Sequence, residues 1–306
     1  MRHLAALVLT CTAAHAEVPR VVTDIPPVHS IVAMVMGDLG APDLLLEQGA
    51  SEHDFQLRPS QMATLADADL VVWIGPELTP WLATALEARD GGGAVLGLFA
   101  DVGTYKINYF AGGLTDDQHD HDEAEGHDHA EGMIDPHVWL DPSTAQYWTG
   151  MIAAELSRLD PDNAATYAAN AATASATIAA AEAEAKSLLE PVKDRPFVTF
   201  HDAYGYFITY FGLSPAGTIA LGDAAAPGAA HLTGLRGLIE TGSVVCLFPE
   251  TQHDAALVGQ MADGSSARIG AALDPVGSTL TPGPDAYPAL ITGLARTLAD
   301  CLKDPA

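Results

Sequence analysis

The sequence has 306 residues, of which 40 are acidic and 13 basic, and its formal net charge is −27. Because 48% of the residues are hydrophobic, the composition excludes a disordered chain, and the length leaves room for two lobes. The acidic balance argues against nucleic acid and anionic membrane surfaces as partners and favours cations.

The first 16 residues are typical of a secretory signal. Arg2 precedes a short apolar stretch at residues 4–10, and Ala14-His15-Ala16 fits a small-x-small cleavage site. Cys11 follows Thr10, a poor match to a lipid-attachment site. We therefore expect a soluble, secreted mature chain that begins at Glu17, and no later segment has the roughly 18 to 20 uninterrupted apolar residues of a membrane span.

The first half of the mature chain alternates short apolar runs with helical patterns. Strands are predicted at residues 20–23, 43–46, 70–74 and 94–99, and helices over residues 28–37, from residue 60 and from residue 78. This alternation predicts a parallel sheet with helices on both of its faces.

The second half begins with a predicted helix over residues 143–159 and an alanine-rich run over residues 163–190. That run predicts one helix of roughly 40 Å, too long for an ordinary crossover between strands. A second series follows, with strands at 197–200, 244–248 and 267–273 and helices at 202–211 and 286–302.

The predicted fold class is α/β, with two lobes of mainly parallel sheets flanked by helices and joined by one long rigid α-helix. The expected boundaries are residues 17–160 for the first lobe, 161–192 for the linking helix and 193–306 for the second lobe.

Two cysteines, Cys246 and Cys301, remain after removal of the signal. An even number of cysteines in an oxidising compartment predicts a disulfide, and the absence of Cys-x-x-Cys argues against a redox-active pair.

Three histidines occur beside prolines or aspartates near predicted strand ends or helix starts: His53, His137 and His201. Loops at the carboxyl ends of parallel strands form ligand sites, and neutral imidazole is a common ligand of zinc. We therefore expect these three to bind a transition metal. His29, His231 and His253 are interpreted as packing or surface residues.

An acidic, histidine-rich tract precedes His137. Nearly every residue from 115 to 131 is Asp, Glu, His, Gly or Ala, and four histidines form two His-Asp-His pairs: His119, His121, His127 and His129. Short His-rich tracts are typical of metal binding. We expect a flexible loop at residues 115–132 that binds metal with low affinity and exchanges it quickly.

A secreted zinc hydrolase is the alternative from a different class, because three histidines and a water suit metal-assisted hydrolysis. The sequence has no His-Glu-x-x-His, and Glu52 is the only general base close to these histidines in the sequence. A metal-binding transport protein that is not an enzyme is therefore favoured.

The sequence resembles the periplasmic solute-binding proteins of zinc ABC importers, within a cluster that also carries manganese- and iron-binding relatives. The matching motifs begin at Gly49 (Gly-Ala-Ser-Glu-His-Asp-Phe), Asp135 (Asp-Pro-His-Val-Trp-Leu-Asp-Pro) and Phe200 (Phe-His-Asp-Ala-Tyr-Gly-Tyr-Phe). The His-rich insertion, the long helix, Leu273-Asp274-Pro275 and the positions of both cysteines also match.

The resemblance implies that Zn(II) is held between two lobes by His53, His137 and His201, and that the carrier delivers it to the membrane permease of a zinc ABC transporter. It implies water, Glu52 or Asp274 as the fourth ligand. Manganese-type relatives replace the third histidine with a carboxylate, so His201 favours zinc, and a manganese or iron carrier of the same family remains the alternative. We expect a monomer.

Overall fold

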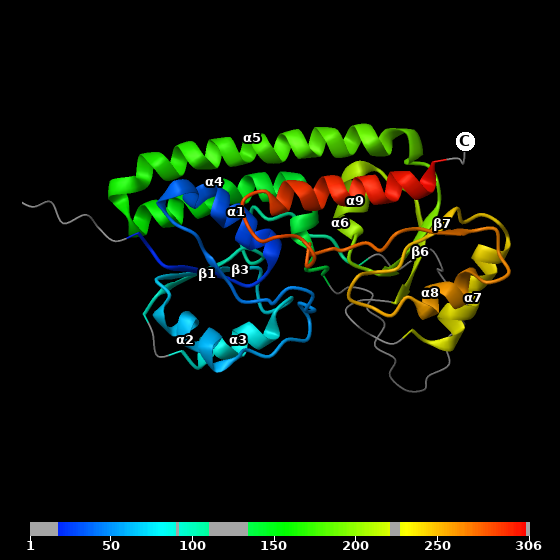
Figure 1. The fold of residues 1–306 in the computed structure, drawn as a ribbon, viewed down its shortest axis with the longest axis horizontal. Coiled ribbons are helices and arrows are strands. Elements are labelled where there is room, and N and C mark those ends of the chain that lie inside the picture. The colour runs from blue at the N-terminus through cyan, green and yellow to red at the C-terminus, as the bar shows by residue number, and fades with distance from the viewer. Residues whose placement is uncertain (1–17, 90–91, 110–133, 221–226, 304–306) are drawn as a thin grey trace, which may run out of the picture.

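Two four-stranded parallel sheets form the centres of two lobes (Figure 1). The computed structural model describes residues 18–89, 92–109, 134–220 and 227–303. The strand orders are β2-β1-β3-β4 and β6-β5-β7-β8, so both sheets have the same topology. The strands are β1 (Val21–Thr23), β2 (Asp43–Leu44), β3 (Leu70–Trp73), β4 (Ala94–Gly97), β5 (Phe197–His201), β6 (Pro215–Ala220), β7 (Cys246–Leu247) and β8 (Arg268–Ile269). Parallel pairing brings the carboxyl ends of the strands of each sheet to one edge.

Helices cover the sheets and join the lobes. They are α1 (Pro26–Met36), α2 (Pro59–Asp67), α3 (Pro80–Glu87), α4 (Pro142–Leu159), α5 (Ala164–Leu189), α6 (Gly205–Phe211), α7 (Ala229–Glu240), α8 (Ala256–Ala262) and α9 (Ala286–Leu302), with short 3-10 turns η1 (Gly37–Leu39), η2 (Val138–Leu140), η3 (Pro161–Asn163) and η4 (Glu190–Val192). Within the described ranges, no helix is long and apolar enough to cross a membrane.

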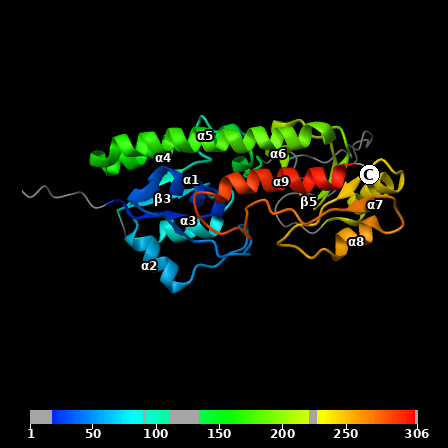
Figure 2. The same cartoon turned by 45° about the horizontal axis from the view of Figure 1, so that its top comes forward.

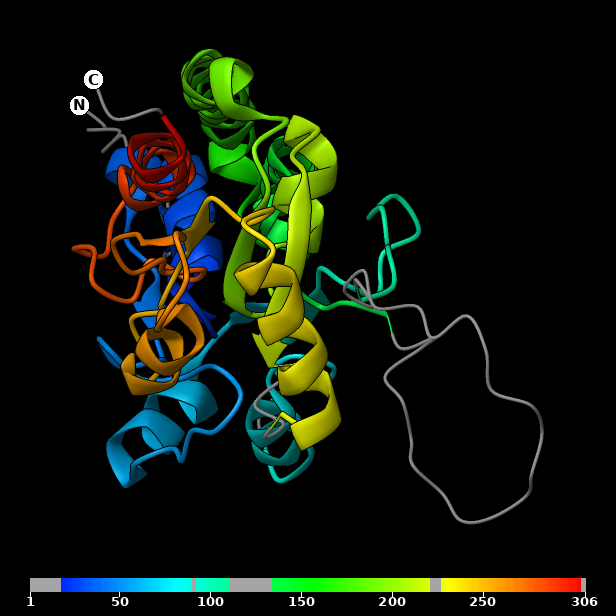
Figure 3. The ribbon, with the colours of Figure 1, turned by 90° about the vertical axis from the view of Figure 1, so that its right-hand side faces the viewer.

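Helix α5 runs along both lobes at one side of the molecule (Figure 1). Its 26 residues span about 39 Å, and it packs against α4 and α9. Figure 2 shows α9 lying alongside it, and the end-on view of Figure 3 shows both helices on the same side of the molecule. The buried stripe of α5 consists largely of alanine, which lets neighbouring helices approach closely.

A single hydrophobic core extends through this helical layer into both lobes. It includes Val28 and Trp139 as well as Phe197, Leu273 and Tyr287. The Trp139 indole N–H donates to the Pro275 carbonyl at 2.8 Å, and the Tyr287 hydroxyl donates to the Trp139 carbonyl at 2.7 Å. Smaller clusters lie beneath the outer helices of each lobe. The two lobes are therefore tied together by packing as well as by the chain.

The expected disulfide is present between Cys246 in β7 and Cys301 in α9. The two cysteines lie 55 residues apart in the sequence. Closing a loop of that length stabilises the folded chain by about 4 kcal/mol through the lost entropy of the unfolded state.

The predicted fold class is confirmed, but some elements differ from the expectation. Sequence patterns missed β6 because its residues, from Pro215 to Ala220, include proline and glycine and no long apolar run. Helix α8 was also missed. Helix α1 begins at Pro26, two residues before the predicted start, because proline suits the first helical turn. The domain boundaries given above stay a prediction.

Candidate metal centre

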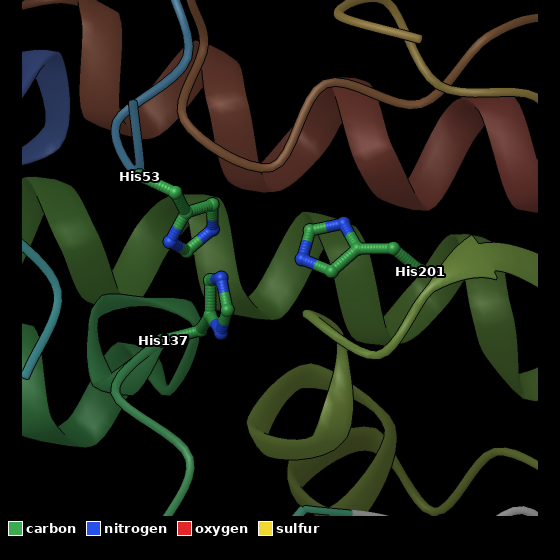
Figure 4. Close-up of side chains that lie close together, drawn as sticks. All are labelled: His53, His137 and His201. Carbon is green, nitrogen blue, oxygen red and sulfur yellow. The ribbon is translucent and has the colours of Figure 1, made fainter. Parts of the chain in front are cut away.

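The three histidines come from three segments that are far apart in the sequence. His53 lies in the loop between β2 and α2, His137 directly precedes η2, and His201 is the last residue of β5. Figure 4 shows the three rings turned towards one another between the lobes. His201 thus lies at the carboxyl end of a parallel strand, where ligand sites form, and the two other histidines are brought to it by loops.

The imidazoles are close enough to share one ion. Their ring centroids are 5.3 Å apart for His53 and His137, 5.2 Å for His137 and His201, and 5.8 Å for His53 and His201. One ring nitrogen from each lies within 4.8 Å of the other two. His137 and His201 are 0% and 2% exposed, and the side chain of His53 is 12% exposed. The arrangement is therefore a nearly closed cluster of nitrogen donors.

Two of these rings each have a buried carboxylate next to Nδ1. Asp135 Oδ1 lies 2.7 Å from His137 Nδ1 and also accepts the backbone N–H of His137 at 2.9 Å. Glu250 places both carboxylate oxygens 3.0 Å from His201 Nδ1. When Nδ1 carries the proton and donates it to a carboxylate, the lone pair of the ring is on Nε2. Both carboxylates therefore prepare Nε2 as the metal-binding atom.

Glu52 adds a carboxylate to the same enclosure. It is 2% exposed, and its Oε1 lies 3.6 Å from His53 Nε2. Burial raises the pKa of Glu52, while His137 and His201 act in the opposite direction. Its backbone carbonyl accepts the indole N–H of Trp81 at 2.8 Å, which fixes the loop against α3. A cation among these imidazoles would compensate the cost of burying this charge.

Asp274 is engaged elsewhere. Its carboxylate accepts the backbone N–H groups of Ser278 and Thr279 at 2.9 Å and 3.0 Å, and it also accepts both hydroxyls and the Gln252 amide. Metal binding by Asp274 would break the turn that these bonds hold.

The remaining predicted residues fall into two groups. His119, His121, His127 and His129 lie outside the described residues. His29 and His231 each place Nε2 near a backbone carbonyl, of Pro42 at 3.1 Å and of Thr218 at 2.8 Å, in keeping with a packing role.

Sequence reasoning missed Glu250, and it interpreted His253 as an ordinary surface or packing residue. Glu250 follows β7 closely and is 4% exposed. It accepts the Tyr204 hydroxyl at 2.9 Å, and its Oε1 lies 3.3 Å from His253 Nε2. Its position after a parallel strand is the same signal that drew attention to His201, so the strand-end rule could have found it.

Comparison with known proteins gives a consistent family match. Residues 21–301 match the family described as "Zinc-uptake complex component A periplasmic". The chain is 48% identical to the high-affinity zinc uptake system protein ZnuA of Paracoccus denitrificans, over 97% of this chain and 96% of that protein. It is 37% identical to the protein of the same name from Brucella suis, over 92% and 91% of the two chains.

A solved structure supports the fold. The crystal structure of a zinc-bound ZnuA deletion mutant aligns with a TM-score of 0.75, covering 94% of this chain and 100% of that one at 24% identity. At that identity, the likeness concerns the arrangement of the elements alone.

Proposed function

The chain belongs to the family of periplasmic zinc-uptake components A, and we propose that it binds one Zn(II) ion through His53, His137 and His201 and delivers it to the permease of an ABC importer. The observation that carries the proposal is the convergence of one nitrogen from each histidine within 4.8 Å of the others. Three imidazoles and one oxygen donor form a common tetrahedral zinc site. The importer is inferred from the zinc-uptake names of the relatives.

The donor set favours zinc over manganese. All three side chains are imidazoles, whereas a manganese site prefers more oxygen ligands. Glu52 or a water molecule is the fourth ligand in this proposal, because the Asp274 carboxylate already accepts five hydrogen bonds, four from Ser278 and Thr279 in its own turn and one from Gln252. Glu52 is adjacent to His53 in the sequence, and its carboxylate interacts electrostatically with His137 and His201.

The site supports carriage rather than catalysis. The imidazoles and the nearest carboxylates are largely buried by the residues that the structure describes, which suits retention of a metal ion. We propose a monomer in the periplasm after removal of residues 1–16, with the four-histidine tract as a low-affinity accessory that captures zinc. These parts rest on the sequence and on the family.

A competition titration against a zinc chelator tests the proposal. Wild-type protein, His137→Ala and His231→Ala are titrated with zinc in the presence and absence of manganese. His231→Ala is the matched control because its imidazole lies outside the cluster and bonds the Thr218 carbonyl. We expect one tight site in the wild type and the control, at least a hundred-fold weaker binding in His137→Ala, and little competition by manganese.

The same titration is repeated with asparagine at His119, His121, His127 and His129. Retention of the tight site would support the three-histidine centre with the tract as accessory. Loss of tight binding in this variant, or tight binding that survives His137→Ala, would overturn the proposed site.

A further inference from the structure

A second group of metal-binding side chains lies on the other side of the His201 ring. It consists of His201, Glu250 and His253, whose candidate ligand atoms lie within 4.8 Å of one another. His201 takes part through Nδ1, whereas Nε2 is the nitrogen oriented for the three-histidine centre. We propose that His253, Glu250 and His201 Nδ1 form an outer site for a divalent cation, through which zinc passes to or from the three-histidine centre.

Distances within this group suit a small cation. Glu250 Oε1 lies 3.0 Å from His201 Nδ1 and 3.3 Å from His253 Nε2. Two ligands at zinc bond lengths in a tetrahedron lie about 3.3 Å apart. Glu250 Oε1 therefore lies between two imidazole nitrogens, and its distances to both are close to the distance between two ligands of a tetrahedral zinc ion.

Burial differs between the two ends of the group. Glu250 and His201 are buried, whereas the side chain of His253 is 28% exposed. Its ring stacks on Phe200 with a centroid distance of 4.5 Å, which fixes the orientation of the imidazole. His253 is thus the donor that an ion arriving from solvent reaches first, and His201 is the donor shared with the interior.

The donor set of the group also suits zinc, which binds carboxylate oxygens and imidazole nitrogens. The carboxylate is that of Glu250. It is held by the Tyr204 hydroxyl at 2.9 Å through Oε2, which leaves Oε1 directed towards His253.

One neutral imidazole has a single lone pair, so the two positions are occupied in turn. A metal ion on Nδ1 requires the ring proton to be on Nε2. Inward transfer breaks the bond between the metal and Nδ1 and forms one between the metal and Nε2. The Nε2 proton leaves to water, Nδ1 takes a proton from water, and Glu250 then accepts the new N–H.

A test isolates the outer site in a background that lacks the inner one. The background protein is the full chain with His53→Ala and His137→Ala, and with asparagine at His119, His121, His127 and His129. The inference rests on the proposed function only because both sites share His201. This background lacks two ligands of the inner site, so a failure of the outer site here says nothing against the inner site. Zn(II) affinity is measured by chelator competition, and Co(II) binding by its visible absorption bands.

Three variants are added to the background singly: His253→Ala, His253→Gln and His231→Ala. We expect one residual equivalent of bound metal, with affinity reduced at least ten-fold by His253→Ala and by His253→Gln and unchanged by His231→Ala. Glutamine keeps a donor towards Glu250 but loses the imidazole lone pair, so it separates metal binding from hydrogen-bond support. Absence of residual binding, indifference to His253→Ala, or full retention of affinity in His253→Gln would each overturn the outer site.

Discussion

Asp135 affects zinc binding indirectly, by orienting the imidazole of His137. It lies 2.7 Å from His137 Nδ1 and is 0% exposed. In Asp135→Asn, the amide can present an N–H to Nδ1 and so favour the wrong tautomer of the imidazole. Loss of a carboxylate behind a metal-binding histidine weakens binding roughly 10–100-fold. We expect a weakening in this range by chelator competition, with Asp162→Asn, an exposed position, as control. Equal affinities in the two variants would contradict the assigned role.

Asp24 predicts a pH dependence of stability in the metal-free protein. It is fully buried at the end of β1 and accepts the backbone N–H groups of Ile25 and Ile74 at 2.9 Å each. Burial outweighs these bonds and raises the pKa of Asp24 from 3.8 to about 7. Between these values the folded state holds a proton that the unfolded state has lost, so stability falls as pH rises from about 4 to 7.

The shift corresponds to about 4 kcal/mol once the pH exceeds 7. Urea unfolding between pH 4 and 8, with a chelator present, should show a steeper decline for the wild type than for Asp24→Asn, which has no carboxyl to titrate. Parallel stability curves for the two proteins would show that Asp24 does not titrate in this range.

At the scale of elements, the alanines of α5 are packing residues. Ala174 and Ala185 lie on its buried stripe, whereas Ala180 is exposed. Leucine at Ala174 would overpack the layer that α5 forms with α4 and α9. We expect Ala174→Leu to lower the free energy of unfolding by about 1–3 kcal/mol in urea, and Ala180→Leu to change it little. Equal effects would mean that the helix is only a linker.

Elements with a strong local signal could be predicted from the sequence, and weaker ones could not. The alanine run of α5 and the apolar run of β3 have patterns that one element type explains. Strand β6 has no such pattern, because Pro215 and Gly217 are poor strand formers and its place in the sheet is set by pairing with β5. Three-dimensional context, rather than propensity, determines such a strand.

The candidate site was predictable to the same limited extent. His53, His137 and His201 stood out because each neighbours prolines or aspartates at an element boundary. Glu250 faces His201 because β7 and β5 are neighbouring strands of the second sheet, and this pairing of strands has no local signature in the sequence.

At the scale of the whole molecule, the shared core predicts little motion between the lobes. Trp139 and Tyr287 bond across the interface, and the Ser30 hydroxyl donates to the Pro284 carbonyl at 3.0 Å. Helices α5 and α9 span the same region (Figure 2). Small-angle scattering should therefore give nearly superimposable profiles with and without zinc. A large compaction on zinc binding would contradict this account and favour hinge closure.

The proposed function depends on one zinc ion bound by His53, His137 and His201. The most direct test is anomalous diffraction at the zinc absorption edge, from crystals of the protein with one equivalent of zinc. We expect one dominant peak about 2.0–2.1 Å from the Nε2 atoms of all three histidines. A dominant peak that is bonded to none or only one of them would contradict the proposal.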